Sequence, residues 1–174
     1  MNEVKVVKIT KADLDARGFY AASADLDVDG SIEIEGGLGW VRLRGYLRAS
    51  ASINAAAGSG IKAGSGIEAG LGIKAGSGIE AGSGIEAGWG IEARWGIKAG
   101  SGIEAGFQIS SQKTISAKLR IFAGLCTWRL PEPEEMTITA RRVDGTVCFG
   151  EVNLLPAGEK EAPGAGEQPT GTEG

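Results

Sequence analysis

The sequence predicts an all-β protein, a three-sided parallel β-helix with about eighteen residues in each coil. The first observation is that isoleucine recurs at every sixth position from Ile61 to Ile109 without a break. The second is the near-constant filler between isoleucines: a charged residue, alanine, glycine, a variable residue and glycine. The third is that residues of like character recur every eighteen positions, so three six-residue units complete one coil.

The six-residue unit predicts β-strands because its character alternates with period two. Isoleucine, alanine and the variable residue share one parity, and the charged residue and the two glycines share the other. Successive side chains of a strand point to opposite faces, so this alternation is typical of a strand. Two glycines in each unit would destabilise an α-helix by about 1 kcal/mol each. A glycine-rich linker is the alternative, but a linker has no reason to keep an unbroken isoleucine spacing.

The variable and charged positions decide the coil length. At the eighteen-residue interval one column contains large apolar residues, namely Leu71, Trp89 and Phe107. The charges of Lys62, Glu80 and Lys98 alternate in sign at the same interval. A twelve-residue interval would instead stack glutamates about 4.8 Å apart, where like charges repel. Three units in each coil are therefore favoured.

Changes in composition divide the chain into four expected parts. These are an N-terminal cap (1–23), the β-solenoid (24–130, with the regular repeat at 58–109), a C-terminal cap (131–155) and a disordered acidic tail (156–174). We expect the N-terminal cap to contain a short strand and a brief helix that Thr10 caps and Gly18 ends. The C-terminal cap is expected to be a β-hairpin with a type I′ turn at Asp144 and Gly145.

The first coils are expected to be irregular and to be joined by ion pairs. Acidic residues at 25–35 are followed by basic residues at 42–48. A seventeen-residue offset places Asp25 beside Arg42 and Leu26 over Leu43. Exposed ion pairs of this kind contribute more to register than to stability.

The composition argues against catalysis. The chain has 174 residues, no histidine and two cysteines. We therefore expect no zinc or other metal site, no cofactor and no enzymatic activity. Cys126 and Cys148 are expected to be buried free thiols, with a disulfide between them as the alternative.

The charge and hydropathy pattern limits the classes of binding partner that we expect. The net charge of −4 does not indicate a nucleic-acid-binding or membrane-binding surface. The N-terminal residues contain no apolar run that resembles a signal peptide or a spanning helix. We expect a cytoplasmic protein with a protein partner or complex, and without a small-molecule substrate, direct nucleic-acid contact or membrane contact.

The repeat resembles a known family. The sequence Ile-Lys-Ala-Gly-Ser at 61–65 and Ile-Glu-Ala-Gly-Ser at 79–83 resembles the hexapeptide repeat of left-handed β-helix proteins. Most enzymes of that family are acyltransferases with a histidine as general base, which this chain lacks. Residues 26–53 resemble bactofilins, small β-helix proteins that polymerise end to end, in their short aliphatic strands with charged outward residues. That second resemblance implies a self-assembling scaffold.

Two groups of residues interrupt the monotony of the repeat and are the candidate binding sites. The first is an aromatic cluster in which an arginine replaces a repeat glycine: Trp89, Arg94, Trp95 and Phe107. Exposed tryptophan with arginine is typical of protein interfaces. The alternative, which is slightly favoured, is that these side chains are core residues that fill a widened coil. Two tryptophans in one coil would crowd a triangular core, so either the coil is wider there or at least one of them faces outward. The second group is a ladder of like charges that a basic partner would stabilise: Glu68, Glu86 and Glu104. The alternative, which is favoured for this ladder, is a tolerated solvated edge.

By elimination the sequence predicts a non-enzymatic interaction protein. It would dock on a larger macromolecular complex and inhibit or scaffold it, as phage or mobile-element inhibitors of bacterial defence such as anti-CRISPR proteins do. The alternative is a bactofilin-like scaffold that forms a homodimer or a higher oligomer. An ice-binding solenoid is less favoured, because outward glutamate and lysine are unlike a flat threonine array.

Overall fold

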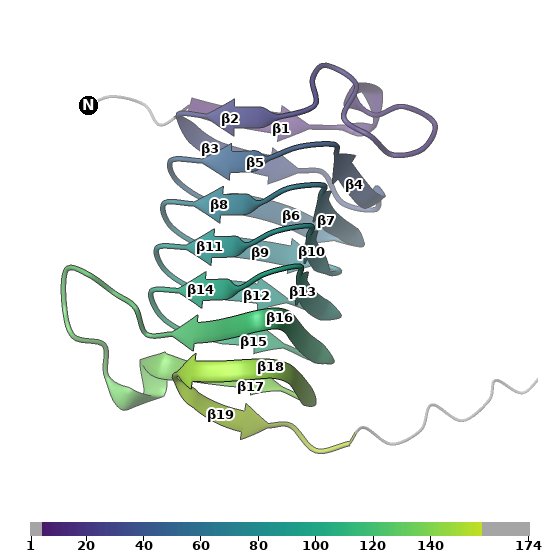
Figure 1. Ribbon diagram of the computed structural model, residues 1–174. Helices are drawn as coiled ribbons and strands as arrows, with labels where there is room; N and C mark the ends of the chain where they lie inside the picture. Colours follow the sequence, from purple (N-terminus) through teal and green to yellow (C-terminus); the bar gives the residue numbers. More distant parts are fainter. Residues whose placement is uncertain (1–4, 158–174) are drawn as a thin grey trace, which may run out of the picture.

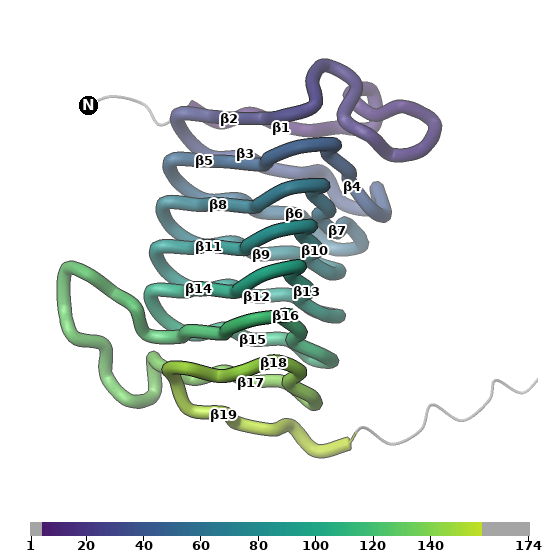
Figure 2. Tube along the Cα trace, viewed as in Figure 1, coloured from purple at the N-terminus to yellow at the C-terminus, as the bar shows by residue number. Residues whose placement is uncertain are grey.

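The computed structural model describes residues 5–157 and shows a parallel β-solenoid whose coils stack along one axis (Figure 1). Every register between two named strands is parallel. The expected all-β, three-sided parallel β-helix is confirmed. The path of the tube in Figure 2 shows the chain passing from one side of the stack to the next in each coil.

The strands form three faces. Face 1 contains β1 (Lys5–Ile9), β3 (Gly30–Ile34), β6 (Ile53–Ala57), β9 (Ile73–Gly76), β12 (Ile91–Ala93), β15 (Ile109–Ser111), β17 (Thr137–Ala140) and β19 (Glu151–Leu154). Face 2 contains β4 (Gly39–Leu43), β7 (Ser59–Ala63), β10 (Ile79–Ala81) and β13 (Gly96–Ala99). Face 3 contains β2 (Leu26–Val28), β5 (Leu47–Ala49), β8 (Ile67–Ala69), β11 (Ile85–Ala87) and β14 (Ile103–Ala105). The longer strands β16 (Thr114–Ala123) and β18 (Arg142–Phe149) run along face 2 and continue round the corner into face 3.

The core is built from two residues of each unit, isoleucine and alanine. In β11, for example, Ile85 and Ala87 are buried while Glu86 between them is exposed. The register places Ile85 between Ile67 and Ile103 of the neighbouring coils. Burying an isoleucine contributes about 1.5–3 kcal/mol, and the stacked columns extend this contribution along the whole solenoid.

The length of the coil changes along the chain. In the regular region the offset is eighteen residues, as in the pairing of Ile61 with Ile79. It is larger near the N-terminus, where Leu26 pairs with Leu47 and Leu47 pairs with Ile67. The expected seventeen-residue offset of the first coils is therefore wrong. Extra residues at the corners lengthen these coils, which brings Arg48 rather than Arg44 to the side of Asp27.

The N-terminal end has the expected strand, followed by one turn of 3-10 helix, η1 (Lys11–Asp13), instead of a longer helix. The Asp13 carboxylate accepts hydrogen bonds from the Thr10 amide and hydroxyl, each at 2.8 Å. These bonds lower the pKa of Asp13. Gly18 then turns the chain at a φ of 79°, and the Tyr20 amide donates to the Arg42 carbonyl of β4.

The C-terminal end contains paired strands, but their geometry differs from the expected turn. Asp144 and Gly145 lie inside β18, so no type I′ turn forms between them. After the short 3-10 helix η2 (Pro133–Met136), β17 and β19 pair in parallel as a further part of face 1. The stack thus extends beyond residues 24–130 at both ends. Most of the expected disordered tail, residues 158–174, lies outside the described residues.

The two glycines of the six-residue unit differ in how closely the neighbouring coil approaches them. At the corner that follows each alanine, the backbones of neighbouring coils approach so closely that a Cβ at Gly82 would overlap the Gly64 carbonyl oxygen. A Cβ at Gly84, in contrast, would lie 3.7 Å from the Gly102 carbonyl oxygen, an ordinary contact. Neither glycine has a positive φ. In this unit the first glycine is therefore required by close packing, and the second is not.

We expect Gly82→Ala to lower the free energy of unfolding by about 1–3 kcal/mol, because the added methyl group forces the two coils apart. Gly84→Ala is the matched control and is expected to leave stability unchanged or to raise it by up to about 1 kcal/mol, since it reduces the entropy of the unfolded chain. Chemical denaturation of both variants measures the difference. Equal destabilisation by the two substitutions would contradict the assignment.

Candidate docking surface

Face 3 positions the glutamates that the sequence singled out. The strand alternation directs the charged residue of each unit outward, and the register aligns Glu68, Glu86 and Glu104 in adjacent coils. We call these three residues the acidic ladder. Adjacent strands lie about 4.8 Å apart, so the carboxylate of Glu86 has a like charge on each side.

Arginine compensates only the N-terminal end of the acidic ladder. The Arg48 Nε lies 2.6 Å from Glu68 Oε2, and its Nη1 lies 3.7 Å from Asp27 Oδ2. The hydrogen bond to Glu68 raises the pKa of Arg48. Neither Glu86 nor Glu104 forms an ion pair with a group among residues 5–157. The negative charge of the acidic ladder is therefore concentrated in its last two members.

The other two faces are arranged differently. On face 2 the Lys62 Nζ lies 2.7 Å from Glu80 Oε2. On face 1 the Lys74 Nζ lies 3.2 Å from Glu92 Oε2. The alternation of sign that the sequence showed in these columns thus becomes cross-coil ion pairs, and face 3 lacks it beyond Glu68.

The surroundings of Glu86 raise its pKa above the usual value of 4.5. Partial desolvation of the carboxylate is the largest cause, followed by the nearby charges of Glu104 and then Glu68. Arg48 acts in the opposite direction as the smallest cause. The folded protein thus holds this ionised group at a cost.

A groove runs along face 3 beside the acidic ladder. It has a volume of about 500 Å³, and its floor includes the alanines and corner glycines of β8, β11 and β14. Its far wall is the connection between β16 and β17, which includes η2 and which we call the 124–136 loop. This loop contributes Leu125, Thr127 and Trp128 to the groove. Carboxylates and apolar side chains therefore share one elongated hollow.

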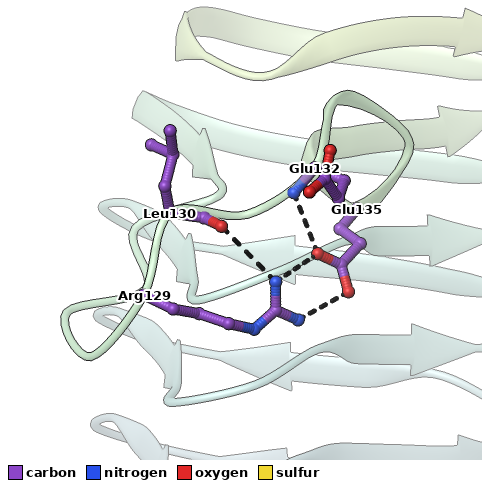
Figure 3. A network of polar contacts seen from close by, with 4 residues as sticks. All are labelled: Arg129, Leu130, Glu132 and Glu135. Atoms are coloured by element: carbon purple, nitrogen blue, oxygen red, sulfur yellow. Dashed lines mark hydrogen bonds and ion pairs between the residues drawn. The ribbon is translucent and has the colours of Figure 1, made fainter.

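An internal clamp holds the 124–136 loop against the solenoid. The Trp128 ring meets the Phe107 ring edge to face, with centroids 5.6 Å apart, and the Arg129 guanidinium lies 4.7 Å from the Phe107 centroid. Arg129 also donates two hydrogen bonds to Glu135, at 2.7 and 2.6 Å, and the Glu132 amide donates to the same carboxylate (Figure 3). The Arg129 hydrogen bonds, with that of Glu132, lower the pKa of Glu135 to about 2.

The aromatic residues lie outside the core. Trp89 is 48% exposed and Trp95 is 58% exposed, so the interpretation that they fill a widened coil is wrong for both. The variable position of the unit lies at a corner, where its side chain projects away from the isoleucine columns. Phe107 is half-buried because Trp128 and Arg129 cover it.

The corners separate the aromatic cluster into two parts. Trp89 precedes β12, at the corner between faces 3 and 1, where its amide donates to the Leu71 carbonyl and its carbonyl accepts from the Phe107 amide. Trp95 and the exposed Arg94 follow β12, at the corner between faces 1 and 2. There the Lys113 Nζ lies 5.0 Å from the Trp95 ring centroid. Only Trp89 and Phe107 therefore border the side of the molecule that carries the acidic ladder.

Sequence reasoning missed the 124–136 loop as part of the site. The signal for it was the loss of the six-residue period after Ile121 together with Trp128, an aromatic residue outside the repeat. Nothing in the sequence shows that this tryptophan returns to Phe107, because the loop contacts a coil that lies earlier in the chain.

The described chain offers few residues for a disulfide or a metal site. Cys126 and Cys148 are free, the first half-buried and the second exposed, so the expectation that both are buried is wrong. Within residues 5–157 no group of three histidine, cysteine or acidic side chains is placed to hold a metal ion. None of the helices in this part of the chain has the length and apolar character needed to cross a membrane.

We expect Glu86→Gln to stabilise the protein at neutral pH, because it removes an ionised group whose folded-state pKa is raised. The gain is fully present above that raised pKa and disappears as the pH falls below 4.5, where the carboxyl is protonated in both the folded and the unfolded chain. Thermal unfolding at neutral and acidic pH measures it. Glu92→Gln is the control, which breaks the pair with Lys74 and is expected to give no gain. A loss of stability in Glu86→Gln at neutral pH would refute this account.

We expect Arg129→Ala to release the 124–136 loop without unfolding the solenoid. Hydrogen–deuterium exchange should then rise at 124–136 and stay unchanged in β8 and β11. In the wild type the same loosening is expected as the pH falls from 4.5 toward about 2, because the lowered pKa of Glu135 means that its contribution is lost on protonation. Arg142→Ala, which removes the pair with Asp144 in β18, is the control. Unchanged exchange at 124–136 in Arg129→Ala would show that the clamp does not hold the loop.

Comparison of the chain with protein-family models, curated proteins and solved structures gives no match. The chain is a parallel β-solenoid with an acidic, aromatic-walled groove on face 3.

Proposed function

We propose that this protein is a non-catalytic docking module that binds a larger protein or protein complex through face 3 and thereby inhibits or scaffolds it. The observation that supports this proposal is that Glu86 and Glu104, which have no cationic partner among residues 5–157, lie beside an apolar groove wall that carries Trp128. The partner it fits is a protein surface that offers lysine or arginine next to aliphatic or aromatic side chains.

The charge pattern supports this choice of face. Like charges in register repel each other. Partial desolvation, followed by the charges of Glu104 and Glu68, raises the pKa of Glu86. A basic side chain of a partner would replace the missing cation and relieve the repulsion on binding. Complementary charge of this kind speeds association and rejects acidic partners.

The aromatic side chains add contact area. Trp128 and Leu125 project from the 124–136 loop and are exposed, as is Trp89 at the neighbouring corner. Tryptophan is enriched among the residues that contribute most to protein interfaces, because it buries a large area with few rotatable bonds. The Arg129–Glu135 clamp holds Trp128 in place before binding, which reduces the entropy that association costs.

The solenoid is a suitable support for such a surface. Its strands carry the acidic ladder at a fixed spacing, and sites built on strands are more precise than sites on loops. Binding and obstruction need no catalytic groups, in agreement with a chain that has no histidine. A bacterial defence complex, the target of anti-CRISPR proteins, is one assembly on which such a module would act.

The test compares face-specific variants in one capture experiment. Proteins retained from a bacterial lysate by the wild type are compared with those retained by the double variant Glu86→Lys, Glu104→Lys. The control is Glu92→Lys, which makes the same type of charge change on face 1. We expect a partner that the wild type and the control retain and the double variant loses, with binding that weakens as salt rises. Equal retention by all three proteins would refute face 3 as the docking surface.

A self-assembling scaffold is the second candidate, and the resemblance to bactofilins supports it. The specific observation in its favour is the last coil, where Phe149, Val152 and Leu154 are exposed. Sedimentation velocity separates the two candidates. Long polymers of the purified chain would favour the scaffold, and a small discrete species would favour the docking module.

A further inference from the structure

The two ends of the solenoid differ in how well they cover the core. Val7 and Ile9 are the first members of two core columns on face 1, and Val152 and Leu154 are the last members of the same columns. Ile9 is 0% exposed, whereas Val152 is 42% and Leu154 is 60% exposed. The same column positions are therefore closed at the N-terminal end and open at the C-terminal end.

Residues 10–23 close the N-terminal end. Leu14 and Tyr20 form an antiparallel bridge and pack against the core cluster. The Arg42 amide donates to the Gly18 carbonyl, so this segment also covers the edge of β4. Figure 2 shows the chain between β1 and β2 looping out at the upper right of the stack. The segment therefore covers β4 and the adjacent core, whereas β1 and β2 in the described chain each pair on one side only.

The C-terminal end presents an open strand edge as well as apolar side chains. In the described chain β19 pairs with β17 on one side only, and β18 pairs with β16 on one side only. Open edges and exposed apolar groups together favour the addition of another strand edge. Residues 158–174 contain no valine, isoleucine, leucine, methionine or aromatic residue. Their composition cannot replace the missing apolar layer.

We propose that the C-terminal coil binds the C-terminal coil of a second copy, which forms a closed two-fold dimer. This surface lies away from the acidic ladder, and the proposal is independent of the docking function. A two-fold contact joins the same surface on both copies and stops at two. The N-terminal end, with Ile9 buried and residues 10–23 over β4, offers less exposed core surface, which favours this closed arrangement over the head-to-tail stacking that would give polymers.

The register of the contact follows from which residues point inward. A two-fold axis makes β19 of the two copies antiparallel, and centring it on Asn153 places Val152 opposite Leu154 of the second copy. Both side chains lie in core columns, so the pairing buries them together. Centring it on Val152 would instead place Leu154 opposite Gly150, which leaves the leucine without an apolar partner.

The same axis is compatible with the rest of the last coil. The corner opposite Asn153 contains Gly145, where β18 passes from face 2 to face 3. On the face 2 side Asp144 lies beside Ser116, and on the face 3 side Thr146 lies beside Arg120. Asp144 already forms an ion pair with Arg142 at 2.8 Å. With the axis at Asn153, Glu151 faces Leu155 of the second copy rather than another glutamate. No like charges are therefore placed opposite each other in β19.

The first test is the mass of the full chain in solution. We expect a species of twice the 17.8 kDa of one chain by light scattering or sedimentation. Leu154→Lys is expected to give monomers that keep the circular-dichroism spectrum of the wild type, because Leu154 is exposed in one chain. The control Leu130→Lys changes an equally apolar, exposed residue of the 124–136 loop and should leave the dimer intact. A monomeric wild type, or a dimer that survives Leu154→Lys, overturns the proposal.

Deletion of residues 158–174 tests whether a second copy or the chain's own tail covers the C-terminal coil. We expect the shortened protein to dimerise as the full chain does. If the deletion converts a monomer into a dimer, the tail covers the end in the intact chain and the proposal fails.

Disulfide trapping tests the symmetry. In a background with Cys126→Ser and Cys148→Ser, Asn153→Cys is expected to form a cross-linked dimer on mild oxidation, since opposed residues of antiparallel strands lie within disulfide range. Lys8→Cys, which occupies the same outward column at the other end, is expected to remain uncross-linked. If the two variants are mixed and oxidised, a cross-link between Asn153→Cys of one chain and Lys8→Cys of another would demonstrate head-to-tail stacking. That product, or the absence of any Asn153→Cys dimer, overturns the two-fold arrangement.

Discussion

The structure depends on the hydrogen-bonded contact between one coil and the next. The Ile67 amide donates to the Gly84 carbonyl, and the Gly82 amide donates to the Ala63 carbonyl, each at 3.0 Å. These bonds hold the backbones of successive coils one strand spacing apart, about 4.8 Å, even at the corners. At that distance a Cβ at Gly82 would overlap the neighbouring backbone, which explains the glycine that follows most alanines of the repeat, with Arg94 as an exception. The same spacing lets isoleucines of neighbouring coils touch along continuous columns.

The constraint that builds the core also limits the surface. Outward residues at one position of successive coils become neighbours, so the sign of each charge matters to the coils on either side. Lys62 and Glu80 use this proximity to form an ion pair, whereas Glu86 and Glu104 meet as like charges. A repeat that alternates sign on two faces and not on the third has an electrostatic cost on that third face. This cost is the physical basis of the proposal that face 3 binds a partner.

The corners are the places where the repeat admits variation. A tryptophan at position 89 or 95 is tolerated because the variable residue of the unit projects outward there. The long strand β16 arises because Lys118, Leu119 and Arg120 replace the glycine-containing corner, so the chain bends gradually from face 2 into face 3. The 124–136 loop leaves after this strand and returns along face 3, where Phe107 provides its contact.

The sequence alone determined the all-β class, the strand period and the eighteen-residue coil, because each is a local rule repeated in every unit. It also placed Glu68, Glu86 and Glu104 in one column, since register follows directly from the coil length. The tertiary structure alone decided what depends on irregular segments: the longer first coils, the continuous strand through Asp144 and Gly145, the outward tryptophans, and the return of Trp128 to Phe107. These features have no repeat to predict them. They are set by which backbone edges and apolar surfaces remain uncovered once the regular coils have stacked.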